Sequence, residues 1–126
     1  MFVVIVIDHI VLKTNQLEKM IAFYCTILGC KVEKIQPEIA LTQIRAGDNL
    51  IDLVAIEQPL DKTHKNLEHF CLRVKPFNFE NLKRYFDVKG VEVRKYGKRT
   101  GAQGIGFSFY IEDPEGNEIE LTGLVH

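Results

Sequence analysis

The sequence has no marked excess of charge and no apolar run long enough to cross a membrane. Sixteen Lys and Arg residues stand against 17 Asp and Glu residues, and the formal net charge is −1. A broad nucleic-acid or anionic-membrane surface needs a clear excess of positive charge. The one candidate apolar run, Phe2 to Ile7, is far shorter than a membrane helix of ~20 residues, has no basic flank and leads directly into Asp8. We therefore expect no nucleic-acid partner, no membrane partner and no signal peptide.

Cysteine is also scarce. Cys25, Cys30 and Cys71 cannot all pair within one chain, and their spacing does not match a close-spaced zinc pattern. A reducing, cytoplasmic location is the simplest expectation for such a chain. The length of 126 residues predicts a single domain spanning residues 1–126.

An internal repeat is the most informative feature that is present. The block from Asp8 to Leu12 recurs as Glu68 to Leu72: an acid, a histidine and three mostly apolar residues. Apolar residues at three- and four-residue spacing follow each block and predict amphipathic helices over residues 17–28 and 79–86. The predicted N-caps are Asn15 and Asn78, and the predicted helix ends are Gly29 and Gly90.

Three strands follow each predicted helix. Turn residues 46–49 and 113–117 favour a tight hairpin between the last two strands of each half. The sequence thus predicts an α+β fold of two βαβββ modules, approximately residues 1–57 and 66–126, joined by a linker over 58–65. The strands expected from the alternating patterns are 31–35, 39–45, 50–56, 91–94, 106–111 and 118–122.

The repeat places four candidate ligands at matching positions. His9 and His69 lie on the first strand of each half, and Asp52 and Glu120 lie on the last. A carboxylate within an apolar strand, such as Asp52, is costly to bury unless it is paired or bound to a cation. The alternatives are a hydrogen-bonded core histidine, a strand-edge Asp52 and a solvent-facing Glu120. Recurrence in register favours a divalent metal, and mixed imidazole and carboxylate ligands suit Zn, Ni, Co, Mn or Fe.

The sequence resembles the vicinal oxygen chelate superfamily, which includes glyoxalases, bleomycin-resistance proteins and extradiol dioxygenases. The resemblance covers nearly the whole chain and is most specific at residues 8–10, 23–29 and 113–121. It implies paired βαβββ modules that curl around a metal cup, and it favours a homodimer. Its metal ligands fall on His9, His69 and Glu120. The fourth position, glutamate in glyoxalase I, falls on Asp52, which is one methylene shorter.

The resemblance implies two enzymatic readings. In the glyoxalase-like interpretation, the protein is a lyase whose small-molecule substrate is a hemithioacetal, that is, a thiol adduct. A carboxylate removes a carbon-bound proton from it while the metal stabilises the resulting enediolate. Glu120 is the preferred catalytic base and Asp52 the alternative. In the fosfomycin-resistance-like one, a thiol or water opens an epoxide, and the stretch Ser108 to Tyr110 favours it. A metal-free, dimeric bleomycin-resistance-like binding protein is the third reading, although such cups usually lack the His and Glu set.

The glycine-rich segment 96–106 is a candidate substrate loop. Lys98 and Arg99 lie there beside flexible backbone, so Arg99 could grip a carboxylate or phosphonate in the manner of a lid. The alternative is a solvated hairpin connection. Tyr110 is a candidate lining residue of the cup, with core packing as its alternative. The predicted substrate-binding residues are therefore Lys98, Arg99 and Tyr110.

Overall fold

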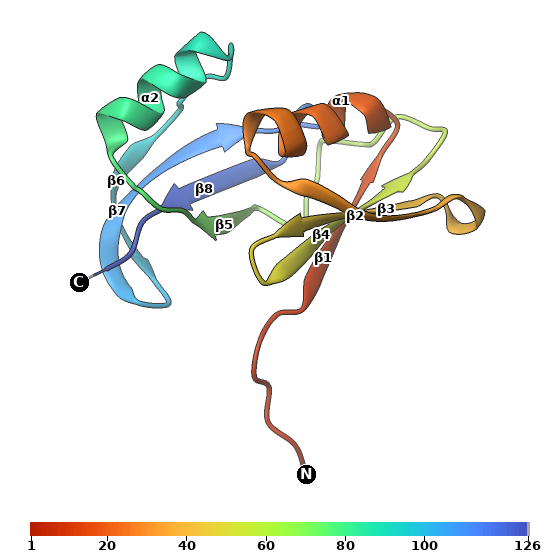
Figure 1. Cartoon of the computed structure of the whole chain (residues 1–126), viewed down its shortest axis with the longest axis horizontal. Coiled ribbons are helices and arrows are strands. Elements are labelled where there is room, and N and C mark those ends of the chain that lie inside the picture. The colour runs from red at the N-terminus through yellow and green to blue at the C-terminus, as the bar shows by residue number, and fades with distance from the viewer. Residues whose placement is uncertain (126) are drawn as a thin grey trace. The chain divides into compact units, whose positions relative to one another are not determined.

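Each half of the chain carries a helical segment and a four-stranded mixed sheet (Figure 1). The computed structural model describes residues 1–125. Two compact units, Met1–Asp61 and Lys62–His126, divide within the predicted linker. The strand orders are β1-β4-β3-β2 and β5-β8-β7-β6, and each sheet has one parallel pair, β1 with β4 and β5 with β8. The predicted α+β class with two βαβββ modules is confirmed.

The first unit contains four strands and one irregular helix. The helix begins as α1 (Leu17–Ile21) and continues as a π-helical segment (Ala22–Ile27). Met20, Phe23 and Tyr24 are buried on its inner face, and Ile44 and Leu53 are buried in the sheet. The strands are β1 (His9–Thr14), β2 (Lys31–Gln36), β3 (Leu41–Ala46) and β4 (Asn49–Ala55), with a 3-10 turn at Pro37–Ile39.

The second unit repeats this order with an aromatic core. Phe109 is fully buried, and its ring contacts those of Phe77, Phe79 and Phe86 at centroid distances of 5.6–5.9 Å. The helix α2 (Phe79–Val88) begins at the predicted cap, where the Asn78 side chain accepts a hydrogen bond from the Asn81 N–H. The strands are β5 (His69–Arg73), β6 (Tyr96–Gly101), β7 (Gly104–Glu112) and β8 (Glu118–Thr122).

Two local predictions are wrong. The strand expected over 91–94 is absent, and β6 begins only at Tyr96, because the chain after α2 is still held by the Val91 N–H donating to the Phe86 carbonyl. Asn15 does not cap the first helix. The N-cap is Gln16, whose N–H donates to the Thr14 hydroxyl, and its side chain makes no capping bond.

The glycines predicted to end the helices do so, since Gly29 and Gly90 both have φ of +75°. Among the described residues, neither helix is long and apolar enough to cross a bilayer.

Candidate metal and substrate site

His69 is oriented by the acidic residue before it. Its Nδ1 lies 2.8 Å from Glu68 Oε1, so the opposite ring nitrogen, Nε2, faces the sheet. That Nε2 lies 3.1 Å from Glu120 Oε1. Histidines that bind metals commonly use one nitrogen as the ligand and hold the other against a carboxylate, which fixes the tautomer and the ring orientation. The Glu68–His69 pair has this arrangement.

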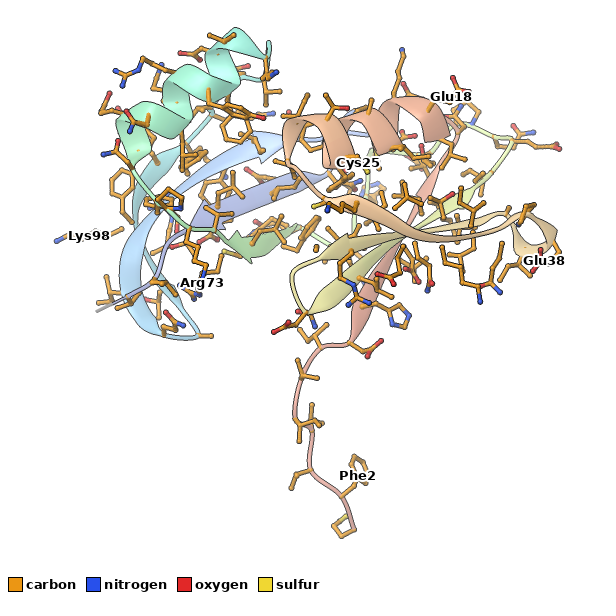
Figure 2. The ribbon with its side chains drawn as sticks, in the orientation of Figure 1. Phe2, Glu18, Cys25, Glu38, Arg73 and Lys98 are labelled. Carbon is orange, nitrogen blue, oxygen red and sulfur yellow. The ribbon has the colours of Figure 1, made fainter. Side chains whose placement is uncertain are left out.

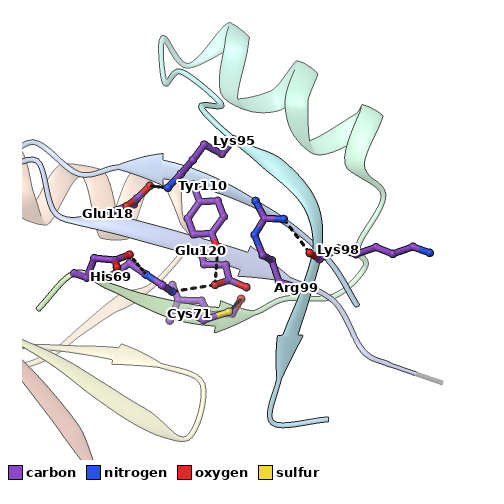
Figure 3. A network of polar contacts seen from close by, with 10 residues as sticks. His69, Cys71, Lys95, Lys98, Arg99, Tyr110, Glu118 and Glu120 are labelled. Atoms are coloured by element: carbon purple, nitrogen blue, oxygen red, sulfur yellow. Dashed lines mark hydrogen bonds and ion pairs between the residues drawn. The ribbon is translucent and has the colours of Figure 1, made fainter. Parts of the chain in front are cut away.

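Glu120 lies in a row of three side chains across neighbouring strands. In the register it pairs with Cys71 of β5 on one side and Tyr110 of β7 on the other. The Tyr110 hydroxyl donates to Glu120 Oε1 at 3.0 Å (Figure 3). Burial raises the pKa of Glu120. Hydrogen bonds from Ser108 and Tyr110 and the nearby His69 lower it by more, so the net pKa lies below its usual value. Glu120 is therefore held as a carboxylate, the form that binds metal.

Two cations lie against the ring of Tyr110. The Lys95 ammonium is 4.5 Å and the Arg99 guanidinium 5.6 Å from the ring centroid. Lys95 also pairs with Glu118 at 2.9 Å. Burial and the hydrogen bond to Glu120 raise the pKa of Tyr110 more than Arg99 lowers it, so the hydroxyl remains protonated and able to donate.

His69, Arg99 and Glu120 border a cavity of about 320 Å³ in the second unit. Its wall combines the candidate ligands His69 and Glu120 with the guanidinium groups of Arg73 and Arg99. Arg73 is held in place by donating to the Gly123 carbonyl. Cys71 also lines the cavity, and burial together with the adjacent Glu120 raises its thiol pKa to about 12. The cavity thus offers metal ligands and positive charge together, with a thiol that stays protonated.

The first unit repeats the histidine arrangement. His9 Nδ1 lies 2.7 Å from Asp8 Oδ2, and its Nε2 lies 3.9 Å from Asp52 Oδ2. The hydrogen bond with Asp8 is the largest influence on His9 and raises its pKa. Asp52 sits between Val11 of β1 and Gln43 of β3 in the register, and Gln43 donates to Asp52 Oδ2 at 3.4 Å. Each carboxylate is therefore held by a side chain from the next strand.

Asp52 has one buried oxygen without a partner. Its Oδ1 is enclosed and makes no hydrogen bond within the described chain, although the residue is only 3% exposed. A buried carboxylate oxygen without a donor is unfavourable and calls for a cation or a further donor. Within residues 1–125, no group of three or more His, Cys, Asp or Glu side chains forms a complete metal site. Each unit instead presents one imidazole and one carboxylate, a donor set that suits a divalent transition metal.

The structure separates the two predicted cationic substrate residues. Arg99 lines the cavity, whereas Lys98 points away from it on the same strand (Figure 3). The segment that carries both is the β6–β7 hairpin rather than an irregular loop. The roles assigned to Lys98, Arg99 and Tyr110 stay predictions.

Sequence reasoning missed several residues that hold this arrangement. Asp8 and Glu68 were visible as the first position of the repeat, but no role was assigned to them. Gln43 and Arg73 gave no signal in the sequence, because their relation to the site depends on strand register.

Glu68→Ala is expected to weaken metal binding about 10- to 100-fold, the usual effect of removing a carboxylate that orients a metal-binding histidine. The affinity can be measured by titrating the metal-free protein with Zn²⁺ in a calorimeter. Glu92→Ala is the matched control, because Glu92 is an exposed acid of the same unit, outside the described site. Equal affinities for both variants would contradict the orienting role.

The fold is that of a class of proteins built from two βαβββ modules. The family model "Glyoxalase/Bleomycin resistance protein/Dioxygenase superfamily" matches residues 6–121, and the chain belongs to this superfamily.

The chain is similar to proteins whose names differ. The chain is 27% identical over 117 residues to the glutathione transferase FosA of Serratia marcescens, covering 91% of this chain and 78% of that protein. An integron cassette protein of V. cholerae matches with a TM-score of 0.79 and 25% identity over 99% of both chains. Lactoylglutathione lyase of Agrobacterium tumefaciens matches with a TM-score of 0.69 and 22% identity, covering 94% of this chain and 92% of that one. The last likeness shows the fold alone.

Proposed function

We propose that this protein is a metal-dependent enzyme that adds a thiol to a small anionic substrate, the fosfomycin-resistance-like alternative of the sequence. The observation that carries the proposal is the cavity in which His69 and Glu120 lie beside Arg73 and Arg99. Guanidinium groups bind phosphonates and carboxylates through paired hydrogen bonds. The similarity to a protein named as a glutathione transferase supports the same choice.

The proposed ligands are His9, His69 and Glu120, with Asp52 as a fourth. Each unit supplies one histidine and one carboxylate. The set of ligands would be completed either within one chain or by a second copy in the expected homodimer. A divalent metal held there supplies Lewis-acid stabilisation of a substrate oxygen. The unpartnered Oδ1 of Asp52 and the low pKa of Glu120 are the features that favour such a cation. Mixed imidazole and carboxylate ligands suit Zn, Ni, Co, Mn or Fe.

The chain's own residues would bind and orient the substrate. Arg99 and Arg73 would hold its anionic group, and the Tyr110 hydroxyl would keep Glu120 in position. For an epoxide substrate, the thiol sulfur forms a bond to a ring carbon while the carbon–oxygen bond breaks. The ring oxygen takes the proton that the thiol loses, so the step needs no further reactant.

A hemithioacetal isomerase is the second candidate, and Asp52 is the residue that favours it. Its Oδ1 accepts no hydrogen bond within the described chain, so this carboxylate could take a carbon-bound proton once the enclosed oxygen turned toward the substrate. The sequence favoured Glu120 as the catalytic base. Its pKa is lowered and its Oε1 already accepts a hydrogen bond from Tyr110, and both features suit a metal ligand better than a base.

The test compares two reactions of the metal-loaded protein: addition of glutathione to fosfomycin, and isomerisation of the hemithioacetal of methylglyoxal and glutathione. Mass spectrometry detects the adduct of fosfomycin and glutathione, and ultraviolet absorbance of the thioester detects the isomerised product, which has the same mass as its substrate. Thiol addition is the expected result. Turnover of the hemithioacetal alone would favour the isomerase. If the protein bound a small molecule but held no metal and turned over neither substrate, the bleomycin-resistance-like alternative would be favoured.

Arg99→Ala is expected to raise the KM for the anionic substrate about 10- to 100-fold, since a hydrogen bond to a charged group contributes ~1.5–3 kcal/mol. Steady-state kinetics of the metal-loaded enzyme measure this change. Lys98→Ala, one residue away and pointing away from the cavity, is the matched control and is expected to leave KM nearly unchanged. A larger effect at Lys98 than at Arg99 would contradict the proposed orientation of the substrate.

A further inference from the structure

Residues 123–125, which follow β8, border two neighbouring cavities of the second unit. The first is the cavity described above, and we call it the site cavity. The second has a volume of about 370 Å³, and we call it the apolar cavity. The apolar side chains in its wall are those of Val74, Pro76, Phe77, Phe107, Leu124 and Val125. Gly106, Thr122 and Val125 border both cavities, so the two lie next to each other.

The side chain of Val125 lies at the boundary between these cavities. A Cβ atom added at Gly106 would lie 3.1 Å from Val125 Cγ2, so the valine side chain covers this glycine closely. Gly106 has no side chain of its own, and the isopropyl group of Val125 fills the space beside it. Truncation of Val125 to alanine would therefore open the site cavity toward the apolar cavity.

Two hydrogen bonds hold the 123–125 segment in this position. Arg73 of β5 donates to the Gly123 carbonyl, and Figure 2 shows the arginine beside this part of the chain. The Val125 N–H donates to the Gln103 side-chain oxygen at 3.1 Å, and Gln103 lies in the turn between β6 and β7. The segment is therefore fixed from two sides of the sheet, and so is the position of the Val125 side chain.

We propose that Val125 is a specificity-determining residue, which restricts the site cavity to anionic substrates with a short substituent by closing it off from the apolar cavity. This inference rests on the proposed function, in which Arg73 and Arg99 hold the anionic group. The anionic substrate and the thiol would share the site cavity of about 320 Å³, so a long substituent has little room there. In the apolar cavity, each buried methylene would raise the affinity about fourfold.

The first test measures the binding of methyl-, butyl- and hexylphosphonate to the Zn²⁺-loaded protein by calorimetric titration. In the unchanged protein, hexylphosphonate is expected to bind no more tightly than methylphosphonate. In Val125→Ala, it is expected to bind at least about tenfold more tightly than methylphosphonate, because its alkyl chain reaches the apolar cavity. Leu124→Ala is the matched control and should leave the dependence on chain length unchanged, since Leu124 borders the apolar cavity but not the site cavity.

The second test, Gln103→Ala, leaves the valine in place and removes the acceptor of its N–H. The 123–125 segment is then held only by Arg73, so the Val125 amide is expected to exchange its hydrogen faster. The preference should shift toward hexylphosphonate, as in Val125→Ala. Nuclear magnetic resonance measures the exchange, and the same titrations measure the preference. Unchanged circular dichroism would show that the variants remain folded.

Three results would overturn this role of Val125. The dependence on chain length could be the same in Val125→Ala and in the unchanged protein, or Leu124→Ala could shift it as much as Val125→Ala does. The Val125 amide could also exchange faster in Gln103→Ala with no change in preference. Failure of the proposed function would differ from these results: methylphosphonate would bind to none of the proteins, and the inference would fall with it.

Discussion

His69→Ala is expected to abolish divalent metal binding, with a loss of affinity well above 100-fold. The imidazole Nε2 that faces Glu120 disappears, and Glu68 then has no ring to orient. Loss of a residue in the outer shell of a metal site already costs about 10- to 100-fold, so loss of a ligand costs more. Calorimetric titration with Zn²⁺ and elemental analysis of the purified protein measure the effect. His9→Ala should behave in the same way.

The chain offers a control for this experiment within the same unit. His64 is exposed, lies before β5 and is outside the described site. His64→Ala should therefore bind metal as the unchanged protein does. If His69→Ala retained full affinity, the ligand set proposed from the repeat would be wrong, although the family assignment would stand.

Phe109→Ala is expected to lower the free energy of unfolding by about 3–5 kcal/mol, the usual cost of truncating a buried phenylalanine. Phe109 is fully buried, and its ring contacts three other phenylalanines. Removal of the ring leaves a cavity whose aromatic walls can collapse only partly. Urea unfolding followed by circular dichroism measures the change.

Phe107→Ala is the matched control for the core prediction. Phe107 lies two residues earlier on β7, on the same face of the strand, but is 38% exposed. Its truncation should therefore cost clearly less than that of Phe109. Equal losses for the two variants would contradict the placement of the core between α2 and this part of β7.

The repeat made much of the architecture predictable. The helix periodicity, the glycines after each helix and the strand–turn–strand patterns are local signals, and they predicted both modules and the α+β class. Errors arose where local preference competed with tertiary pairing. Val91 and Val93 alternate with charged residues, as in a strand. The strand that pairs with β7 is nevertheless β6, which begins further along the chain, at Tyr96. Asn15 is a good capping residue, yet the helix begins one residue later, at a Gln16 cap.

The candidate site was predictable in its residue types and not in its internal geometry. His9, Asp52, His69 and Glu120 recur in register, so the sequence alone determined which residues to consider and how they pair in the repeat. Alternation along β6 decided that Arg99 and Lys98 face opposite ways, and strand pairing decided that Tyr110 and Gln43 hold the two carboxylates. The two contacts that hold the carboxylates join residues on different strands, and hydrogen-bond register sets them. A sequence carries its periodicity along the chain, whereas register across a sheet is decided only when the strands pack.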